Sequence, residues 1–192
     1  MTTFYICRHG ESENNKRGRL MGWIDTPLTE AGKQNAKSSA VKLKNIHFDK
    51  IVASDLGRTF MTAYIIARQL GYASDIEALS GLREMNFGDL ANQPYSAFPT
   101  LSPSEKANYI PPNGESLSQM QQRVLDCVNL LSTKYAGQTV LIVAHDGTIN
   151  AIRASYSQND MGHEDDMHNA HDFVAKFEGS DGQIKSFDEM AQ

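Results

Sequence analysis

Short apolar runs alternate with longer amphipathic patterns along this chain, and this alternation constrains the fold more than any other feature of the sequence. The runs at residues 4–7, 50–53, 76–79 and 140–144 have the length and composition of buried strands. Segments with apolar residues at helical spacing separate them. Strands that alternate with helices predict an α/β fold, with a mostly parallel central sheet flanked by helices.

Two of the intervening segments carry clear helix signals. After Ser54, apolar residues recur at spacings of four and three until Gly71, where a left-handed helix stop is expected. The predicted inner face of this helix consists of Leu56, Phe60, Ala63, Ala67 and Leu70. Ser116 opens a capping box, and an apolar face then continues until Gly137. Both segments are therefore predicted to be helices.

The remaining segments complete the α/β pattern. Thr29 is expected to cap a helix that runs through about residue 43, and another helix is expected just after Gly147. Near the C-terminus, apolar residues alternate over 173–177, and turn residues follow at 179–182. This pattern predicts an antiparallel hairpin at the edge of the sheet.

Residues 90–114 interrupt the periodic pattern with five prolines and several aromatic residues. Such a stretch is typical of a folded lid or substrate-specificity insertion, and the alternative is an inert surface excursion. A length of 192 residues, 40% of them apolar or aromatic, suits one domain with a sizeable core. We therefore expect a single domain over residues 1–192, with the insertion at about 90–114.

Charge and apolar content narrow the function classes. The formal net charge of −5 does not favour binding to nucleic acid or to an anionic membrane surface. No stretch approaches the ~20 apolar residues of a membrane span, so we expect a cytoplasmic protein. Cys7 and Cys127 lie in apolar runs far apart in sequence and are expected to be reduced core thiols.

Basic and acidic side chains gather at the predicted strand ends. Arg8 and His9 follow the first strand, His145 follows the strand at 140–144, and Arg58 and Glu84 come shortly after the other two. A lone histidine is more often structural, but ligands of open α/β sheets bind at this edge. Arginine suits phosphate oxygens and neutral imidazole is a competent nucleophile, so the set favours phosphoryl transfer through a histidine, without a metal.

At these residues the sequence resembles the histidine phosphatase superfamily, with its phosphoglycerate-mutase-like fold. The resemblance spans nearly the whole chain. The matching motifs are Arg8-His9-Gly10-Glu11-Ser12 with Asn15, Gly22-Trp23-Ile24-Asp25-Thr26-Pro27-Leu28-Thr29, Ser54-Asp55-Leu56 with Arg58, Leu82-Arg83-Glu84, Asn113-Gly114-Glu115-Ser116 and His145-Asp146-Gly147.

The resemblance implies an activity and a role for each residue. His9 would be the nucleophile that forms a phosphohistidine, and Glu84 the general acid and later the base. The phosphate pocket would consist of Arg8, Asn15, Arg58 and His145. The chain would be a metal-independent phosphomonoesterase of the histidine acid phosphatase type. It would need no cofactor and would act on a small phosphorylated metabolite.

Two alternatives remain open. A cofactor-dependent phosphoglycerate mutase is less favoured, because this family's mutases carry Glu-Arg-His-Tyr-Gly where this chain has Glu84-Met85-Asn86-Phe87-Gly88. Residues 90–114 also contain no arginine and only Lys106, which is little charge for a bisphosphate. A non-catalytic phospholigand-binding module on the same fold is the other alternative, and such a module should have lost His9 or Glu84.

Two other features bear on the site. Phosphatase members of the family often carry Trp-Glu-Gly where this chain has Leu90-Ala91-Asn92. The sequence therefore differs from the family pattern in the part of the site expected to bind the leaving group. Residues 163–171 gather three histidines with Glu164, Asp165 and Asp166, which are metal-ligand types. Their spacing matches no tight metal motif, and we expect a solvated loop there instead.

Overall fold

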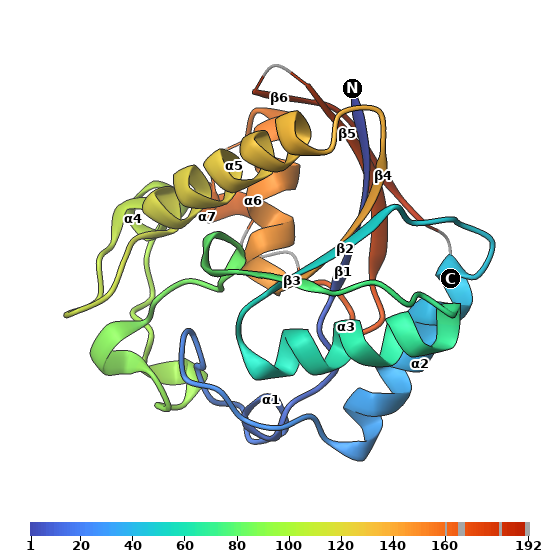
Figure 1. Cartoon of the computed structure of the whole chain (residues 1–192). Coiled ribbons are helices and arrows are strands. Elements are labelled where there is room, and N and C mark those ends of the chain that lie inside the picture. The colour runs from blue at the N-terminus through green and yellow to red at the C-terminus, as the bar shows by residue number, and fades with distance from the viewer. Residues whose placement is uncertain (160, 165–167, 181, 191–192) are drawn as a thin grey trace.

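A six-stranded sheet forms the centre of the computed structural model, which describes residues 1–159, 161–164, 168–180 and 182–190 (Figure 1). Its strands are β1 (Thr2–Arg8), β2 (Lys50–Ser54), β3 (Glu77–Leu79), β4 (Thr139–Ala144), β5 (Val174–Ser180) and β6 (Gln183–Glu189). They lie in the order β3-β2-β4-β1-β5-β6. The first four pair in parallel, and β5 and β6 add antiparallel pairs. The predicted α/β fold with an antiparallel edge hairpin is confirmed.

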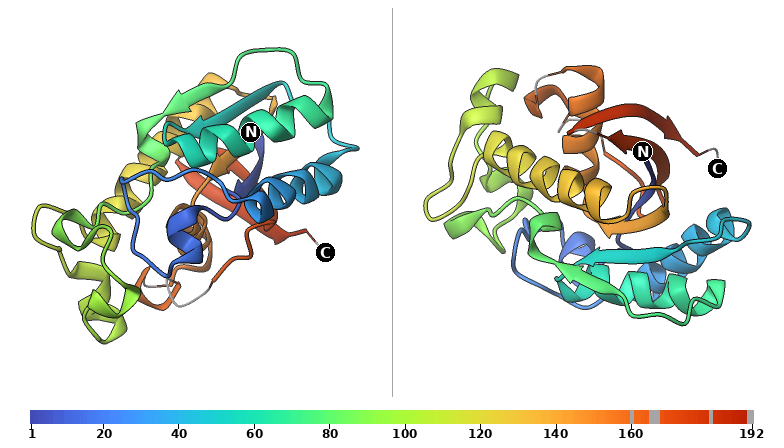
Figure 2. Two further views of the ribbon diagram at one scale, coloured as in Figure 1. Left: turned by 90° about the horizontal axis from the view of Figure 1, so that it is seen from below. Right: turned by 45° about the horizontal axis from the view of Figure 1, so that its top comes forward.

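Helices cover both faces of this sheet. The α-helices are α1 (Glu13–Lys16), α2 (Glu30–Leu43), α3 (Gly57–Leu70), α4 (Pro103–Asn108), α5 (Leu117–Lys134), α6 (Asp146–Ser157) and α7 (Met161–Glu164). Short 3-10 helices are η1 (Ser80–Leu82), η2 (Gly88–Leu90) and η3 (Tyr95–Ala97). Figures 1 and 2 show α2 and α3 on one face and α5 and α6 on the other.

Alternate residues of the central strands enter two separate cores. In β4, Val140 and Ile142 pack with the residues of α5 and α6, whereas Leu141 and Val143 pack with those of α2 and α3. Each of these four side chains is fully buried. The continuous apolar run of β4 follows from this arrangement, because a strand buried on both faces has no polar side.

The helix boundaries follow the predicted capping signals. Ser116 Oγ accepts from the Gln119 amide at 3.1 Å, and Gln119 Oε1 accepts from the Ser116 amide at 2.9 Å. Thr29 Oγ1 caps α2 by accepting from the Gly32 amide at 2.9 Å. Gly71 ends α3 with a φ of 68°, in the left-handed region that glycine adopts readily. The helix expected just after Gly147 begins at Asp146.

The predicted inner face of α3 is wrong at Phe60. This side chain is 40% exposed, whereas Arg58 and Thr62, which the apolar pattern leaves out, are 1% and 0% exposed. Thr62 Oγ1 accepts from the Gly10 amide at 3.1 Å, so this face of α3 holds the loop after β1. The buried face is therefore partly polar, which the spacing of apolar residues does not reveal.

Residues 88–114 fold back onto the loop after α1. The Leu20 amide donates to the Gln93 carbonyl at 2.9 Å, and the Tyr95 amide donates to the Gly18 carbonyl at 3.0 Å. The Phe98 ring makes edge contacts with Phe87 and Tyr109, and these contacts anchor the segment internally. The segment, which includes α4, extends beyond the sheet at the left of Figure 1, in green to yellow.

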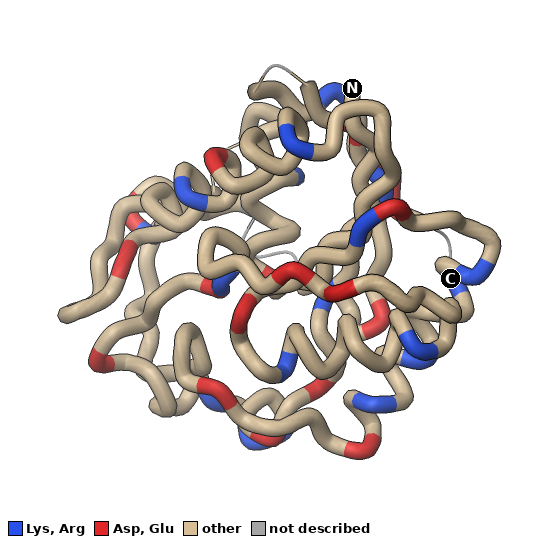
Figure 3. The backbone as a smooth tube through the Cα atoms, in the orientation of Figure 1, with Lys and Arg blue, Asp and Glu red and all other residues tan. Residues whose placement is uncertain are grey.

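Charged residues of both signs are spread along the chain. Figure 3 shows acidic and basic residues interspersed over the helices and loops. Within the described part of the chain, no helix is both long and apolar enough to cross a membrane. Both cysteines are free thiols; Cys7 is buried as expected, but Cys127 is only partly buried.

Candidate active site

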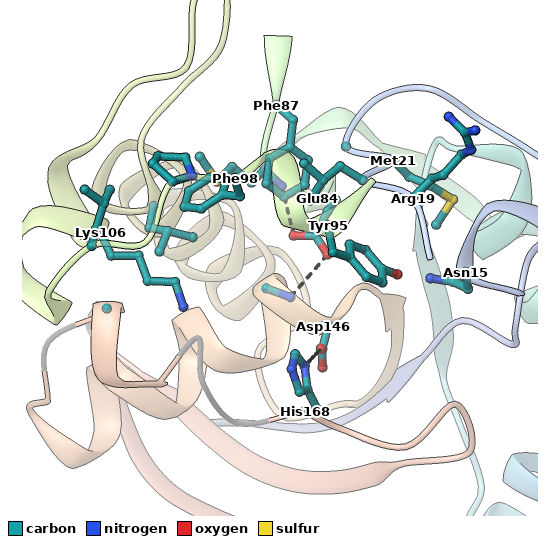
Figure 4. Close-up of a pocket in the computed structure, with 18 of the residues that line it drawn as sticks. Asn15, Arg19, Met21, Glu84, Phe87, Tyr95, Phe98, Lys106, Asp146 and His168 are labelled. Atoms are coloured by element: carbon teal, nitrogen blue, oxygen red, sulfur yellow. Dashed lines mark hydrogen bonds and ion pairs between the residues drawn. The ribbon is translucent and has the colours of Figure 1, made fainter. Parts of the chain in front are cut away.

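The carboxyl ends of the parallel strands meet at one edge of the sheet, where five of the six predicted site residues line one cavity and His145 lies fully buried beside His9. Arg8 and His9 come from the end of β1, His145 from the end of β4, and Arg58 from the first turn of α3. The cavity has a volume of about 690 Å³, and its polar lining residues include Arg8, His9, Asn15, Arg58, Glu84 and Asp146. Figure 4 shows part of this lining. The topology thus unites residues that are far apart in sequence.

His9 is held as a neutral imidazole with one accepting nitrogen. Its Nδ1 lies 2.8 Å from the Gly10 carbonyl oxygen, which can only accept, so Nδ1 carries the proton. Its Nε2 accepts from Arg58 Nε at 3.3 Å. Burial and the nearby charges of Arg58 and Arg8 lower the pKa of His9 well below its ordinary value. The lone pair on Nε2 is therefore present at neutral pH.

Backbone carbonyls and one carboxylate hold the buried Arg58 guanidinium. It donates to the Gly22 carbonyl at 2.8 Å, the Ile24 carbonyl at 3.0 Å and Asp25 Oδ1 at 3.3 Å. Burial lowers the pKa of Arg58, while Glu84 and Asp25 oppose this effect. The side chain is only 1% exposed, so its orientation towards the histidines is fixed before any ligand binds.

His145 lies between Arg58 and Ser54. Its Nδ1 is 3.2 Å from the Arg58 terminal nitrogen, and its Nε2 is 3.0 Å from Ser54 Oγ. Burial and the charge of Arg58 lower its pKa well below the ordinary value, so the ring is neutral. A serine hydroxyl can donate or accept, so Ser54 is compatible with either tautomer. Arginine can only donate, so Nδ1 accepts from Arg58, and Nε2 carries the hydrogen and donates to Ser54 Oγ.

Glu84 lies in the cavity wall beside the start of α6. Its Oε1 accepts from the Met85 amide at 2.9 Å, and its Oε2 accepts from the Gly147 amide at 3.2 Å (Figure 4). The loss of surrounding water is the largest effect on its pKa, and the nearby Asp146 carboxylate adds to it. Together they raise the pKa of Glu84 although the two amides lower it. This carboxyl therefore retains a proton to higher pH than an exposed one.

Arg8 and Asn15 complete the predicted set. Arg8 donates to the Asn169 carbonyl and lies 3.8 Å from Asp146 Oδ2. Its buried Nε has no hydrogen-bond partner among the described residues. Asn15 Oδ1 accepts from the Ser12 amide at 3.1 Å and from Ser12 Oγ at 2.9 Å, which fixes Asn15 at the cavity edge.

The structure also places residues at the site that the sequence did not indicate. His171 Nδ1 lies 3.1 Å from the His9 carbonyl oxygen, and the two rings are 5.8 Å apart. His168 lines the cavity and lies 3.5 Å from Asp146. The solvated loop expected at 163–171 is thus wrong in part, since His163 belongs to α7 and His171 contacts the site. Of the acids in that cluster, those at 165 and 166 lie outside the described residues.

One signal in the sequence bears on these contacts. The predicted edge hairpin begins just after His171, and β5 pairs with β1, so the residues before β5 return to the end of β1. A Cβ atom at Gly10 would lie 2.0 Å from the Gly32 carbonyl oxygen, so Gly10 permits the close approach of α2.

Comparisons with known proteins point to one family. A family model described as the histidine phosphatase superfamily (branch 1) matches residues 4–189. The 2,3-bisphosphoglycerate-dependent phosphoglycerate mutase of Cytophaga hutchinsonii is 32% identical over 177 residues, which cover 86% of this chain and 83% of that protein.

Solved structures agree with this match. Bacillus stearothermophilus YhfR superimposes with a TM-score of 0.85 at 30% identity, covering 96% of this chain and 94% of that one. The alpha-ribazole phosphatase of Shigella flexneri superimposes with a TM-score of 0.82 at 25% identity, covering 98% and 96%. Mutases and phosphatases therefore both occur among the similar proteins.

Proposed function

This chain belongs to the histidine phosphatase superfamily, and we propose that it is a metal-independent phosphomonoesterase acting on a small phosphorylated metabolite. The observation that carries the proposal is the state of His9. Its Nε2 has a lone pair inside the cavity, and two arginines lie beside it. This arrangement suits in-line attack on a phosphorus atom whose oxygens are held by cations.

The first step transfers the phosphoryl group to His9. The Nε2 lone pair forms a bond to phosphorus while the bond to the ester oxygen breaks, giving a phosphohistidine. Arg8, whose buried Nε has no partner among the described residues, binds the equatorial oxygens, and Asn15 adds a hydrogen bond. Arg58 exchanges its contacts with His9 and His145 for the phosphoryl oxygens, which frees the His9 lone pair and lets His145 turn to the phosphoryl group. Glu84 gives its proton to the departing alkoxide, so the alcohol leaves neutral.

The second step regenerates the enzyme. The Glu84 carboxylate formed in the first step accepts a proton from water as the water oxygen bonds to phosphorus and the bond to Nε2 breaks. Inorganic phosphate leaves, and both Glu84 and His9 return to their starting protonation states. The raised pKa of Glu84 favours this cycle, because it makes the carboxyl easier to protonate between turnovers than an exposed carboxyl.

The leaving group would occupy the part of the cavity formed by residues 88–114. Phe98, Leu101 and Lys106 line this part, whereas the Tyr95 ring lies nearer Asn15 and Arg19 on the other side of the view in Figure 4. The wall is thus mainly apolar, with little charge. We propose that this segment acts as the lid that governs substrate choice.

The mutase is the rival activity, because a relative 32% identical bears that name. A bisphosphate-dependent mutase must bind two phosphate groups at once, and Lys106 is the only Lys or Arg between residues 90 and 114. We therefore propose that water, rather than a second phosphorylated ligand, accepts the phosphoryl group. A non-catalytic phospholigand-binding module is the other rival, and His9 together with Glu84 argues against it.

The test is a search for the covalent intermediate together with product analysis. Brief mixing with p-nitrophenyl phosphate should label the wild-type protein with acid-labile, alkali-stable phosphate. His9→Ala should bind inorganic phosphate but show neither label nor turnover. A metabolite panel and a mutase assay with added bisphosphate should then yield inorganic phosphate as the main product. If the wild-type protein binds phosphate but hydrolyses no substrate, the non-catalytic module is supported. Turnover by His9→Ala would exclude the phosphohistidine route.

A further inference from the structure

Asn169 lies between the two oppositely charged side chains at one edge of the site. Its backbone carbonyl accepts from Arg8, while its backbone amide and its Nδ2 both donate to Asp146 Oδ1, at 3.0 Å and 2.7 Å. It is 4% exposed and is not among the described residues that line the cavity. Asn169 therefore contacts both charged groups without facing the ligand space.

We propose that Asn169 is a positioning residue that keeps Arg8 and Asp146 apart, so that the Arg8 guanidinium stays available to the phosphoryl group. This inference rests on the phosphate site of the proposed function. It assigns a role to the segment before β5, which the sequence motifs of the site do not include.

The orientation of the Asn169 amide follows from its partners. An arginine can only donate, and Arg153 lies 2.7 Å from Asn169 Oδ1, so the oxygen faces Arg153. The Nδ2 group must then face the other way, where it donates to Asp146 Oδ1 and, at 2.9 Å, to Asn150 Oδ1. Arg153 is itself held by Glu189 at 2.9 Å and lies against the Phe173 and Phe187 rings.

The distances show why the two charged groups need to be held apart. Arg8 and Asp146 are 3.8 Å apart and little exposed, with side chains that are 15% and 17% accessible. They form an ion pair that is too long for a hydrogen bond. At such a site opposite charges attract more strongly than in water, so a small movement of either side chain would convert this contact into a direct hydrogen-bonded pair. Two amide donors on Oδ1 satisfy the Asp146 carboxylate where it is, so it has less cause to approach Arg8.

A direct Arg8–Asp146 pair would compete with the ligand. The guanidinium has five N–H donors in a fixed plane, and a carboxylate bound in bidentate fashion occupies the same edge that a phosphate oxygen pair needs. The phosphoryl group would then have to displace Asp146. Loss of the Asn169 donor should therefore weaken phosphate binding rather than slow proton transfer.

The test is a binding titration with inorganic phosphate, read by calorimetry. Asn169→Asp keeps the oxygen that faces Arg153 but replaces the Nδ2 donor by a second carboxylate oxygen opposite Asp146. The repulsion should move Asp146 towards Arg8 and raise the Kd for phosphate by about tenfold. Asn129→Asp, which adds the same charge at an exposed position of α5, should leave the Kd unchanged.

A double variant and a pH series separate positioning from a merely structural role. In Asp146→Asn/Asn169→Asp the repulsion between the two carboxylates is absent and no charge at position 146 can pair with Arg8, so the Kd should return towards that of the wild type. Two adjacent carboxylates raise the pKa of one of them, so the ratio of the Asn169→Asp and wild-type Kd values should fall as the pH is lowered. A general loss of structure would show neither effect.

The outcomes are distinct. If the wild type does not bind phosphate, the proposed function fails and this inference fails with it. If the wild type binds but Asn169→Asp binds equally well, or if Asn129→Asp is as weak, this inference alone is wrong. Should Asn169→Asp not fold, Asn169→Ala gives the same comparison, since it should weaken binding in the wild-type background but not in Asp146→Asn.

Discussion

At the scale of single residues, the site depends on how each ionisable group is kept in one protonation state. Arg58 contacts both histidines, and its charge together with burial lowers the pKa of each ring. Burial acts in the opposite direction on Glu84, because it raises the pKa of a carboxyl. The same buried environment thus favours the uncharged forms of both the imidazoles and the carboxyl group.

Arg58→Lys should lose most activity, although it keeps a positive charge. The guanidinium spans the Gly22 and Ile24 carbonyls, Asp25 and both histidines at once, and an ammonium cannot reach all of these partners. The loss of a preorganised donor for the phosphoryl oxygens should lower kcat/KM by roughly 10²–10³-fold. Steady-state kinetics with p-nitrophenyl phosphate would measure it. Activity equal to the wild type would show that Arg58 does not bind phosphate in bidentate fashion.

Glu84→Gln should separate the two half-reactions. An alkoxide needs a proton to leave, so phosphohistidine formation from an alkyl phosphate should slow by about 10²–10⁴-fold, but p-nitrophenolate hardly needs one. Water attack lacks its base with either ester, so rapid quench experiments with the aryl ester should show a burst followed by slow turnover. Equal slowing of phosphorylation for both esters would exclude Glu84 as the leaving-group acid.

The pH profile of the first step is the control for this assignment. In the wild type, phosphorylation by an alkyl ester should decline as the pH rises through the pKa of Glu84, which burial raises from its ordinary value. It should decline at low pH only where His9 takes up a proton, below the ordinary imidazole range. Glutamine does not titrate, so the alkaline decline should be absent from Glu84→Gln.

At the scale of elements, the contact between α2 and the loop after β1 sets the position of His9. A Cβ atom at Gly32 would lie 2.0 Å from the Glu11 carbonyl oxygen, and Gly10 packs against the same first turn of α2. The Thr29 amide donates to the Glu11 carbonyl at 2.9 Å across this contact. Two glycines thus bring α2 against the residues that follow the first strand.

Gly32→Ala should disturb both stability and the site. The added methyl group meets backbone, which cannot move without shifting the loop that carries His9, so we expect a loss of roughly 1–3 kcal/mol. Thermal unfolding would measure this loss, and the Kd for phosphate should rise as well. Gly71→Ala is the matched control, because it forces a positive φ but meets nothing within 4 Å among the described residues. It should lose stability and retain the wild-type Kd.

The elements could largely be predicted from the sequence because their signals are local. Buried parallel strands are continuous apolar runs, and the Ser116 capping box marks the start of α5 directly. The exposure of Phe60 could not be predicted, because the inner face of α3 carries the polar residues Arg58 and Thr62. Thr62 is buried there because it binds the loop after β1, and the sequence of α3 alone does not show this contact. His171 and Asn169 reach the site only through the pairing of β5 with β1, which no short-range pattern specifies.

At the scale of the whole molecule, the end of the cavity proposed to bind phosphate and the end proposed to be covered by the lid are held by different parts of the fold. Arg8, Arg58 and His145 come from the sheet and its first helical turns. Residues 88–114 are held instead by the loop after α1 and by the contact of α4 with α7, where a Cβ atom at Gly162 would lie 1.8 Å from the Pro103 carbonyl oxygen. The two ends should therefore respond to different substitutions.

Gly162→Ala should impair recognition of the leaving group while leaving phosphate binding intact. The methyl group cannot fit against the Pro103 backbone, so α4 must move away from α7 and carry Lys106 and the wall around Leu101 with it. For a substrate that fills this end, KM should rise by about tenfold, which corresponds to ~1.4 kcal/mol of lost contact. The inhibition constant of inorganic phosphate should stay at the wild-type value, since phosphate needs only the strand-end residues.

Gly137→Ala, where the added methyl meets no described residue within 4 Å, should change neither quantity. A parallel rise in both constants for Gly162→Ala would show that the lid and the phosphate pocket form one unit, and the lid would then not act on substrate choice alone.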